Sequence, residues 1–126
     1  MSDTAMMTKQ KIFTKVAKHL LKQNAKSRKT NDGIPSGYCA YRGYNGMTCA
    51  IGCIIPDEAY ELRFEGEGVR GLPETLFKAM KVSYDYNSLI FLRELQHIHD
   101  LAPVSNWPEK LKMFAKNNDL KMPRMS

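Results

Sequence analysis

The 126-residue sequence predicts an α+β fold that is mainly α, with about four helices packed around a small β-hairpin. Two observations lead to this prediction. All eight glycines lie between Gly33 and Gly71, so the flanking segments lack the residue that helices most avoid after proline. Asn45-Gly46, a dipeptide typical of tight hairpin turns, stands between two runs of strand-forming residues. The length suits one domain over residues 1–126, with frayed tails at 1–7 and 121–126.

The first predicted helix runs from Thr8 to about Gln23. Thr8 is a suitable N-cap, and the apolar residues of this segment recur at helical spacing, so they share one face. These residues are Ile12, Phe13, Val16, Ala17, Leu20 and Leu21. The stretch 24–36 is polar and ends in turn-forming residues, so we expect a loop there.

The predicted hairpin brings residues 38–42 against residues 47–50, with Asn45-Gly46 as a two-residue turn. In this register Tyr44 pairs with Met47, and Arg42 pairs with Cys49. Beyond the hairpin we expect a short helical piece around 50–55, a turn near 57–60 and an exposed loop over 64–71.

Three more helices are predicted in the second half of the chain. They span residues 73–82, 86–100 and 107–118. Pro73 suits the first turn of the short helix, and Asp85 is a candidate N-cap for the next one. The last helix begins after Asn106 or Ser105 and carries Pro108 in its first turn.

The net charge of +6 is unevenly distributed along the chain. Residues 1–30 are net +7, residues 31–75 are net −4 and residues 76–126 are net +3. The overall composition is that of an ordinary globular protein. The chain has no apolar run of the length that spans a membrane, and its first residues lack the apolar core of a signal peptide. We therefore expect a cytoplasmic protein with no membrane association.

The three cysteines, Cys39, Cys49 and Cys53, allow four interpretations. A disulfide between Cys39 and Cys49 is disfavoured, because the predicted hairpin places them on opposite faces. Zinc is disfavoured, because structural zinc sites use close pairs of ligands and a second close pair is missing. A catalytic thiolate would use His99 as its base, oriented by Asp100. The fourth interpretation, which we favour, is that the cysteines pack as small buried apolar residues. We expect no metal and no cofactor.

Four lysines of the first helix, Lys11, Lys15, Lys18 and Lys22, recur at helical spacing and form one line. Such a line is typical of a solvated helix face, and it is also suited to following a row of phosphates. Lys26, Arg28 and Lys29 extend the charge into the next segment. Aromatic residues that stack on bases do not alternate with these lysines. Binding of nucleic acid through this helix is therefore an alternative function.

The central segments resemble a family of small uncharacterised proteins of tailed bacteriophages and some bacteria. The resemblance rests on Cys39-Ala-Tyr-Arg-Gly43, on Cys49-Ala-Ile-Gly-Cys-Ile-Ile-Pro-Asp-Glu-Ala-Tyr60 and on Glu65-Gly-Glu-Gly-Val69, together with His99-Asp100 and Asn106-Trp-Pro108. It covers residues 10–115 and implies a bacteriophage or prophage origin, the cytoplasm of an infected bacterium, and an accessory role in host takeover or against host defence. The pattern marks a family and does not specify an activity.

The resemblance and the incomplete catalytic set favour a binding protein over an enzyme. The expected partner is a host protein, a component of a defence system or a small ligand. The expected binding surface surrounds the hairpin, because exposed Tyr and Arg often anchor interfaces. Its residues are Tyr41, Arg42, Tyr44, Glu65, Glu67 and Arg70. A second alternative is an enzyme or zinc site centred on the cysteines.

Overall fold

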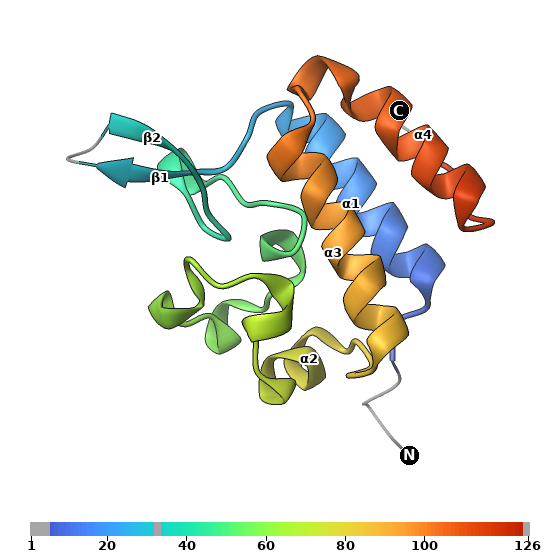
Figure 1. Cartoon of the computed structure of the whole chain (residues 1–126), viewed down its shortest axis with the longest axis horizontal. Coiled ribbons are helices and arrows are strands. Elements are labelled where there is room, and N and C mark those ends of the chain that lie inside the picture. The colour runs from blue at the N-terminus through green and yellow to red at the C-terminus, as the bar shows by residue number, and fades with distance from the viewer. Residues whose placement is uncertain (1–5, 32–33, 125–126) are drawn as a thin grey trace.

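A computed structural model describes residues 6–31 and 34–124, with backbone only for 29–31, 34–39 and 44. This part of the chain contains four α-helices and two strands. The helices are α1 (Lys9–Gln23), α2 (Glu74–Met80), α3 (Tyr86–Leu101) and α4 (Trp107–Asn117), and the strands are β1 (Arg28–Asn31) and β2 (Ile34–Cys39). The helices α1, α3 and α4 lie side by side, and the two strands project from the opposite end of the molecule (Figure 1).

The helices begin where the capping residues predict. The Thr8 side chain accepts a hydrogen bond from the Lys11 backbone N–H, and the Asp85 side chain accepts one from the Ser88 backbone N–H. These bonds satisfy backbone donors that the first turn of a helix leaves without partners. Asn106 precedes α4 as predicted, although its side chain makes no capping hydrogen bond. The mainly helical character of the fold is confirmed.

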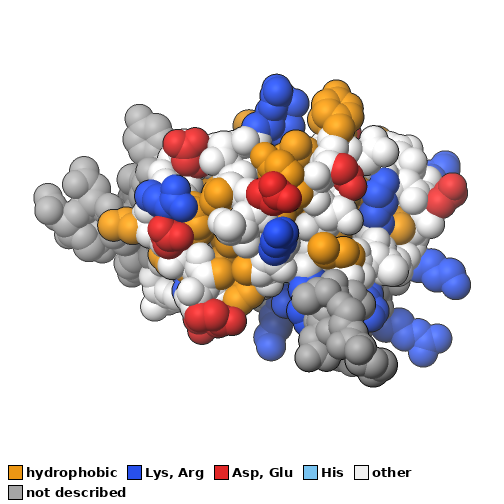
Figure 2. All heavy atoms as spheres, turned by 90° about the horizontal axis from the view of Figure 1, so that it is seen from below, with side chains coloured by type: hydrophobic (Ala, Val, Ile, Leu, Met, Phe, Trp, Pro, Cys, Tyr) orange, Lys and Arg blue, Asp and Glu red, His pale blue; other side chains and the backbone are white. Residues whose placement is uncertain are grey.

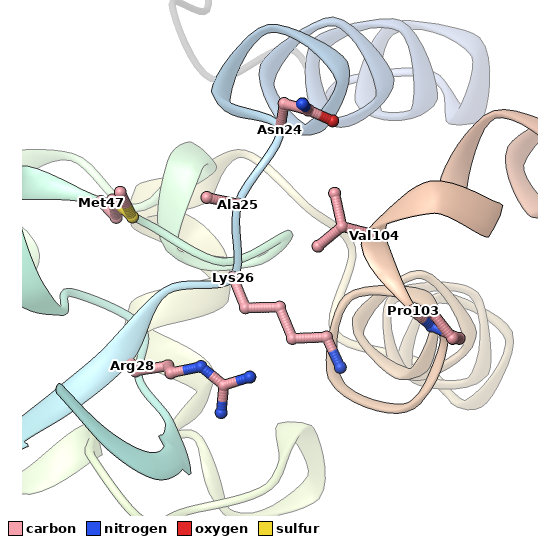
Figure 3. Close-up of a pocket in the computed structure, with 7 residues that line it drawn as sticks. All are labelled: Asn24, Ala25, Lys26, Arg28, Met47, Pro103 and Val104. Carbon is pink, nitrogen blue, oxygen red and sulfur yellow. The ribbon is translucent and has the colours of Figure 1, made fainter.

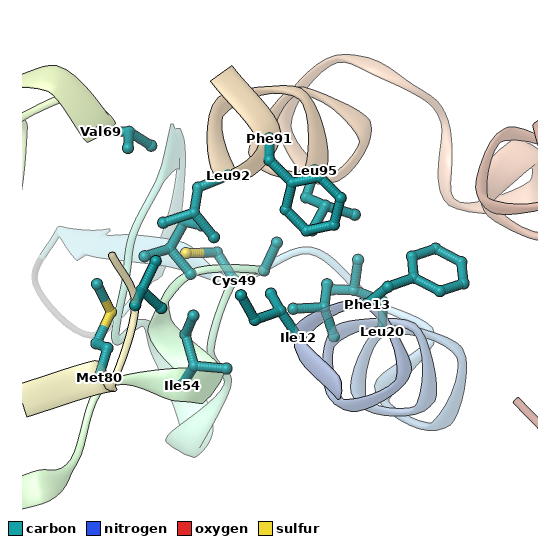
Figure 4. Close-up of a cluster of buried hydrophobic side chains, with 14 of the residues drawn as sticks. Ile12, Phe13, Leu20, Cys49, Ile54, Val69, Met80, Phe91, Leu92 and Leu95 are labelled. Atoms are coloured by element: carbon teal, nitrogen blue, oxygen red, sulfur yellow. The ribbon is translucent and has the colours of Figure 1, made fainter. Parts of the chain in front are cut away.

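The core lies where α1, α3 and α4 meet the central segment 49–82. Phe13 and Phe91 both pack on Phe114, at ring centroid distances of 5.6 and 5.2 Å. Cys49, the first residue of the central segment, lies among the aliphatic side chains of this core (Figure 4). Burying such apolar surface contributes about 25 cal/mol per Å² and drives the packing of the helices.

The predicted α+β fold around a central hairpin is wrong. In place of the hairpin ladder, residues 40–49 contain an isolated bridge between Arg42 and Thr48. Asn45 and Gly46 do adopt the positive φ values of a tight turn, 57° and 75°. However, the backbone N–H groups of Tyr41 and Arg42 donate to the Glu65 carboxylate and not to a partner strand. The predicted register is wrong as well, because Arg42 lies opposite Thr48 and not Cys49, and the Gly43 backbone N–H donates to the Met47 carbonyl around a three-residue turn.

The strands β1 and β2 instead occupy the stretch that we expected to form a loop. They pair antiparallel, with Asn31 opposite Ile34 and Arg28 opposite Cys39. The residues that join them, Asp32-Gly33, lie outside the described part of the chain. Asp-Gly is itself a hairpin signal, so this sheet was detectable in the sequence. The sheet is short and peripheral, and the fold is mainly α.

Between the sheet and α2 the chain folds into short 3-10 turns. Those at Gly52–Ile54 and Asp57–Ala59 match the predicted helical piece and turn. Near the ends of the described chain, the Met7 backbone N–H donates to the Lys81 carbonyl, and Lys121 exchanges two hydrogen bonds with the Gln10 side chain. No helix in the described ranges has the length and apolarity that crossing a lipid bilayer requires.

Candidate functional site

The residues of the family-like pattern meet in one hydrogen-bonded cluster around Glu65. Its carboxylate accepts the backbone N–H of Tyr41 at 2.9 Å and that of Arg42 at 3.0 Å, and it also accepts the Tyr60 hydroxyl at 2.6 Å. The Tyr41 hydroxyl donates to the Glu67 carbonyl. Tyr41 is buried, so it serves the fold and is not exposed as an interface anchor.

The Arg42 guanidinium continues this cluster toward the surface. Its Nη2 donates to the Ile55 carbonyl at 3.2 Å and to Asp57 Oδ1 at 2.7 Å. The guanidinium also lies over the ring of Tyr60, 4.5 Å from the centroid, which is a cation–π arrangement. Arg42 therefore connects the segment after β2 with the segment that contains Asp57 and Tyr60.

Two glycines of the pattern allow close approach between backbone segments. A Cβ atom on Gly52 would lie 2.0 Å from the Tyr41 carbonyl oxygen, and one on Gly43 would lie 2.4 Å from the Arg28 carbonyl oxygen. Backbone atoms cannot move aside as a flexible side chain can. The pattern is therefore explained largely by its role in the fold.

His99 is fully buried and has a structural hydrogen bond on each ring nitrogen. Its Nε2 accepts the backbone N–H of Ser27 at 2.9 Å, so Nδ1 carries the proton and donates to Asp100 Oδ1 at 2.7 Å. The ring also packs against Trp107, with the centroids 5.5 Å apart. The orientation by Asp100 that we predicted is present, but both nitrogens are engaged within the fold, which does not suit a general base for a cysteine.

Cys49 and Cys53 are free thiols in environments that suppress ionisation. Burial raises the pKa of Cys49 far above its ordinary value. Burial also raises the pKa of Cys53 to about 12, and the nearby charge of Lys15 opposes part of this effect. Because the thiolate is the reactive form, these environments favour unreactive thiols. The side chain of the third cysteine, Cys39, lies outside the described part of the structure.

Within the described residues, no group of three or more His, Cys, Asp or Glu side chains is arranged to hold a metal ion. Cys49 Sγ accepts the Gly52 backbone N–H, and the Cys53 thiol donates to the Ala50 carbonyl. The two sulfurs therefore have hydrogen-bond partners within their own turn. The geometry does not support a site centred on Cys49 or Cys53.

A polar pocket of about 380 Å³, which we call the glycine pocket, opens beside α1. It is lined by His19, Arg42, Gly43, Gly46, Met47, Thr48, Gly52, Cys53, Ile55 and Asp57. Its α1 wall is held in place because His19 Nε2 and the Gln23 amide both contact the Thr48 carbonyl at 2.9 Å. Its volume lies within the range of about 300–1,000 Å³ that is typical of small-molecule sites.

The exposed face of α1 carries the lysine line of Lys11, Lys15, Lys18 and Lys22, and all four are exposed. The helix contains no acidic residue. Residues 9–23 and 107–124 together hold ten Lys and Arg but two acidic residues, for a net charge of +8, whereas the rest of the chain is net −2. Figure 2 shows Lys and Arg side chains projecting from the helical end of the molecule, while Asp and Glu are frequent toward the other end.

A second pocket, of about 600 Å³, lies at the C-terminal end of α1, and we call it the α1-end pocket. Lys26 and Arg28 lie between Met47 on one side and Pro103 and Val104 on the other (Figure 3). The Lys26 ammonium group donates to the Asp100 carbonyl at the end of α3. The pocket therefore continues the positive charge of α1 beyond the last turn of the helix.

The remaining predicted binding residues are dispersed. Arg70 is exposed and lines a smaller pocket with Arg93 and His97, and Glu67 is exposed nearby. The side chain of Tyr44 is not described. Sequence reasoning did not single out His19 as a pocket residue, although its position beside the lysine line was visible. Sequence reasoning also missed Val104 as a lining residue of the α1-end pocket, and it missed the contact of Thr48 with α1. Contacts between distant segments carry no local sequence signal.

We compared the chain with protein-family models, with curated protein sequences and with solved structures, and none of them matches it. The family resemblance and the bacteriophage origin that it implies therefore stay predictions. Proposals about function rest on the geometry and charge described above.

Proposed function

We propose that this protein binds nucleic acid through the lysine line of α1. The single observation that carries the proposal is an exposed row of four lysines on a helix that has no acidic residue. Lys110, Lys112 and Lys116 on α4 are also exposed, and α4 packs against α1 through the contact of Phe13 with Phe114. The surface of this pair of helices therefore carries an excess of positive charge.

The length of the lysine line suits a phosphate backbone. Eleven residues separate Lys11 from Lys22, which corresponds to about 16 Å along a helix axis. Double-stranded DNA carries one charge per about 3.4 Å along each strand, so this length follows about five phosphates of one strand. Four lysines then displace about four counterions, which supplies a favourable and strongly salt-dependent free energy of binding.

The other functions that we predicted are less well supported by the geometry. Binding of a host protein through the surface around Tyr41 would need an exposed ring, and Tyr41 is buried. A cysteine-centred enzyme would need an available base, and both nitrogens of His99 are engaged. An accessory role in the cytoplasm of an infected bacterium is compatible with binding nucleic acid and stays a prediction.

The proposal is tested by fluorescence anisotropy with labelled single-stranded and double-stranded oligonucleotides over a range of salt concentrations. With four phosphate contacts, we expect affinity to fall about 100-fold between about 50 and 200 mM salt. The double variant Lys15→Glu/Lys18→Glu should bind at least tenfold more weakly than wild type.

The matched control is Lys78→Glu/Lys81→Glu, which changes the net charge equally. Both lysines are exposed but lie at the end of α2 and not on α1. The control should retain most of the affinity. Equal loss in the two double variants, or no binding of either oligonucleotide, overturns the proposal.

A further inference from the structure

The glycine pocket presents hydrogen-bonding groups that the fold does not use. In the described part of the chain, every hydrogen bond of the Arg42 side chain uses Nη2, so Nε and Nη1 remain available as donors. Asp57 Oδ1 accepts the hydrogen bond from Arg42. The Asp57 side chain is 94% exposed, so Oδ2 remains available as an acceptor. The pocket therefore has donors and an acceptor next to each other.

The walls of the pocket suit a flat ring. The backbones of Gly43, Gly46 and Gly52 line it without side chains, and Met47 and Ile55 add apolar surface. Unpaired bases stack on aromatic rings, including that of histidine, and on arginine guanidinium planes, and His19 and Arg42 supply such groups in the lining of the pocket. The edge of a base inserted here would form hydrogen bonds with Arg42 and Asp57.

The pocket adjoins the lysine line. His19 lies on α1 between Lys18 and Lys22 in sequence and lines the pocket. Lys15 lies close enough to Cys53, another lining residue, to influence its charge state. A strand whose phosphates follow the lysine line therefore passes the mouth of the pocket.

We propose that the glycine pocket binds an unpaired guanine base of a single strand held on the lysine line. Guanine offers acceptors at O6 and N7 and donors at N1 and N2. These two donors lie side by side and match the two oxygens of the Asp57 carboxylate, and O6, which adjoins N1, matches one free N–H group of Arg42. The inference rests on the proposed function and gives it a substrate class, which is single-stranded nucleic acid that contains guanine.

The test compares two labelled oligonucleotides, a run of twelve thymidines and the same run with one central guanosine. Wild-type protein should bind the guanosine-containing strand about tenfold more tightly, as one bidentate base contact allows. Replacing guanosine by inosine, which lacks the N2 amino group, should remove part of this preference.

The variant Asp57→Asn should lose the guanosine preference, measured as the ratio of the affinities for the two strands. Asparagine still accepts a hydrogen bond from Arg42, so the fold should be retained. Glu58→Gln is the matched control, because Glu58 is also exposed, changes charge equally and does not line the pocket. It should keep the preference.

Equal affinity of wild-type protein for the two strands overturns the inference, and so does equal loss of preference in Asp57→Asn and Glu58→Gln. In both cases salt-dependent binding of the thymidine strand leaves the proposed function standing. Absence of binding to either strand overturns the inference, and the proposed function falls as well if the double-stranded oligonucleotide also fails to bind.

Discussion

The Nε2 atom of His99 accepts the backbone N–H of Ser27 at 2.9 Å, and 72 residues of chain separate the two. Ser27 lies between α1 and β1, whereas His99 lies in the last turn of α3. The same segment is held a second time, because Lys26 donates to the Asp100 carbonyl. The exit of the chain from α1 is thus attached to the end of α3.

We predict that His99→Ala lowers the free energy of unfolding by about 3 kcal/mol. The substitution removes a fully buried ring from its contact with Trp107 and leaves the Ser27 N–H without an acceptor. His97→Ala on the same helix is the control, because His97 is exposed and should change stability by less than about 0.5 kcal/mol. Urea unfolding monitored by circular dichroism measures both. Similar small losses in the two variants would contradict the structural role of His99.

Glu65→Ala should destabilise the protein by about 2 to 3 kcal/mol, because two backbone donors and the Tyr60 hydroxyl lose their acceptor. Glu67→Ala is the matched control. The Glu67 side chain is exposed, and its contact with Tyr41 uses the backbone carbonyl, which the substitution retains. Thermal unfolding should separate the two variants clearly. If both unfold together, the carboxylate of Glu65 does not hold this region.

Gly52→Ala should destabilise the fold by about 3 kcal/mol, because the new Cβ would overlap the Tyr41 carbonyl. The corresponding change at Gly68 meets no atom within 4 Å, and its φ of −74° suits alanine. Gly68→Ala should therefore be neutral or stabilising by up to about 1 kcal/mol. Denaturant midpoints report the difference, and a tolerated alanine at position 52 would mean that the two backbone segments can separate.

In a Cys39→Ser background, the thiols of Cys49 and Cys53 should react slowly with Ellman's reagent at about pH 8, and rapidly once the protein is unfolded. Burial raises the pKa of both thiols, so little thiolate is present in the folded state. The ratio of the two rates measures the protection. A thiol that reacts at the unfolded rate in native protein would revive a catalytic role for that cysteine.

Stability should also fall at alkaline pH. The pKa of Cys53 is raised from 9.0 to about 12 in the folded protein, so the unfolded chain releases this proton first as pH rises. The contribution is fully present below about pH 9 and is lost as pH rises toward 12, by up to about 1.4 kcal/mol per pH unit. Cys53→Ala should make the pH dependence shallower over this interval in urea unfolding. An unchanged slope would show that Cys53 ionises with equal ease in both states.

The helices were predictable because their signals are local. Thr8 caps α1 and Asp85 caps α3 through bonds to residues three positions ahead, and an apolar face repeats within a few turns. The exposed lysine line was predictable for the same reason, since it is the face opposite the core. The left-handed backbone at Asn45-Gly46 was predictable too, because it depends on those two residues.

The sequence by itself therefore determined the helices, the turns and the basic face of α1. The tertiary structure decided which acceptors bind the backbone N–H groups beside the Asn45-Gly46 turn. The Glu65 carboxylate accepts the backbone N–H groups of Tyr41 and Arg42, which lie 24 and 23 residues before it, so the expected ladder does not form. The tertiary structure also decided that His99 accepts the backbone N–H of Ser27, and that Arg42 and Asp57 line a pocket beside α1. These partners depend on which groups from distant parts of the chain reach the same donor or the same space. Such groups come together only when the chain is packed.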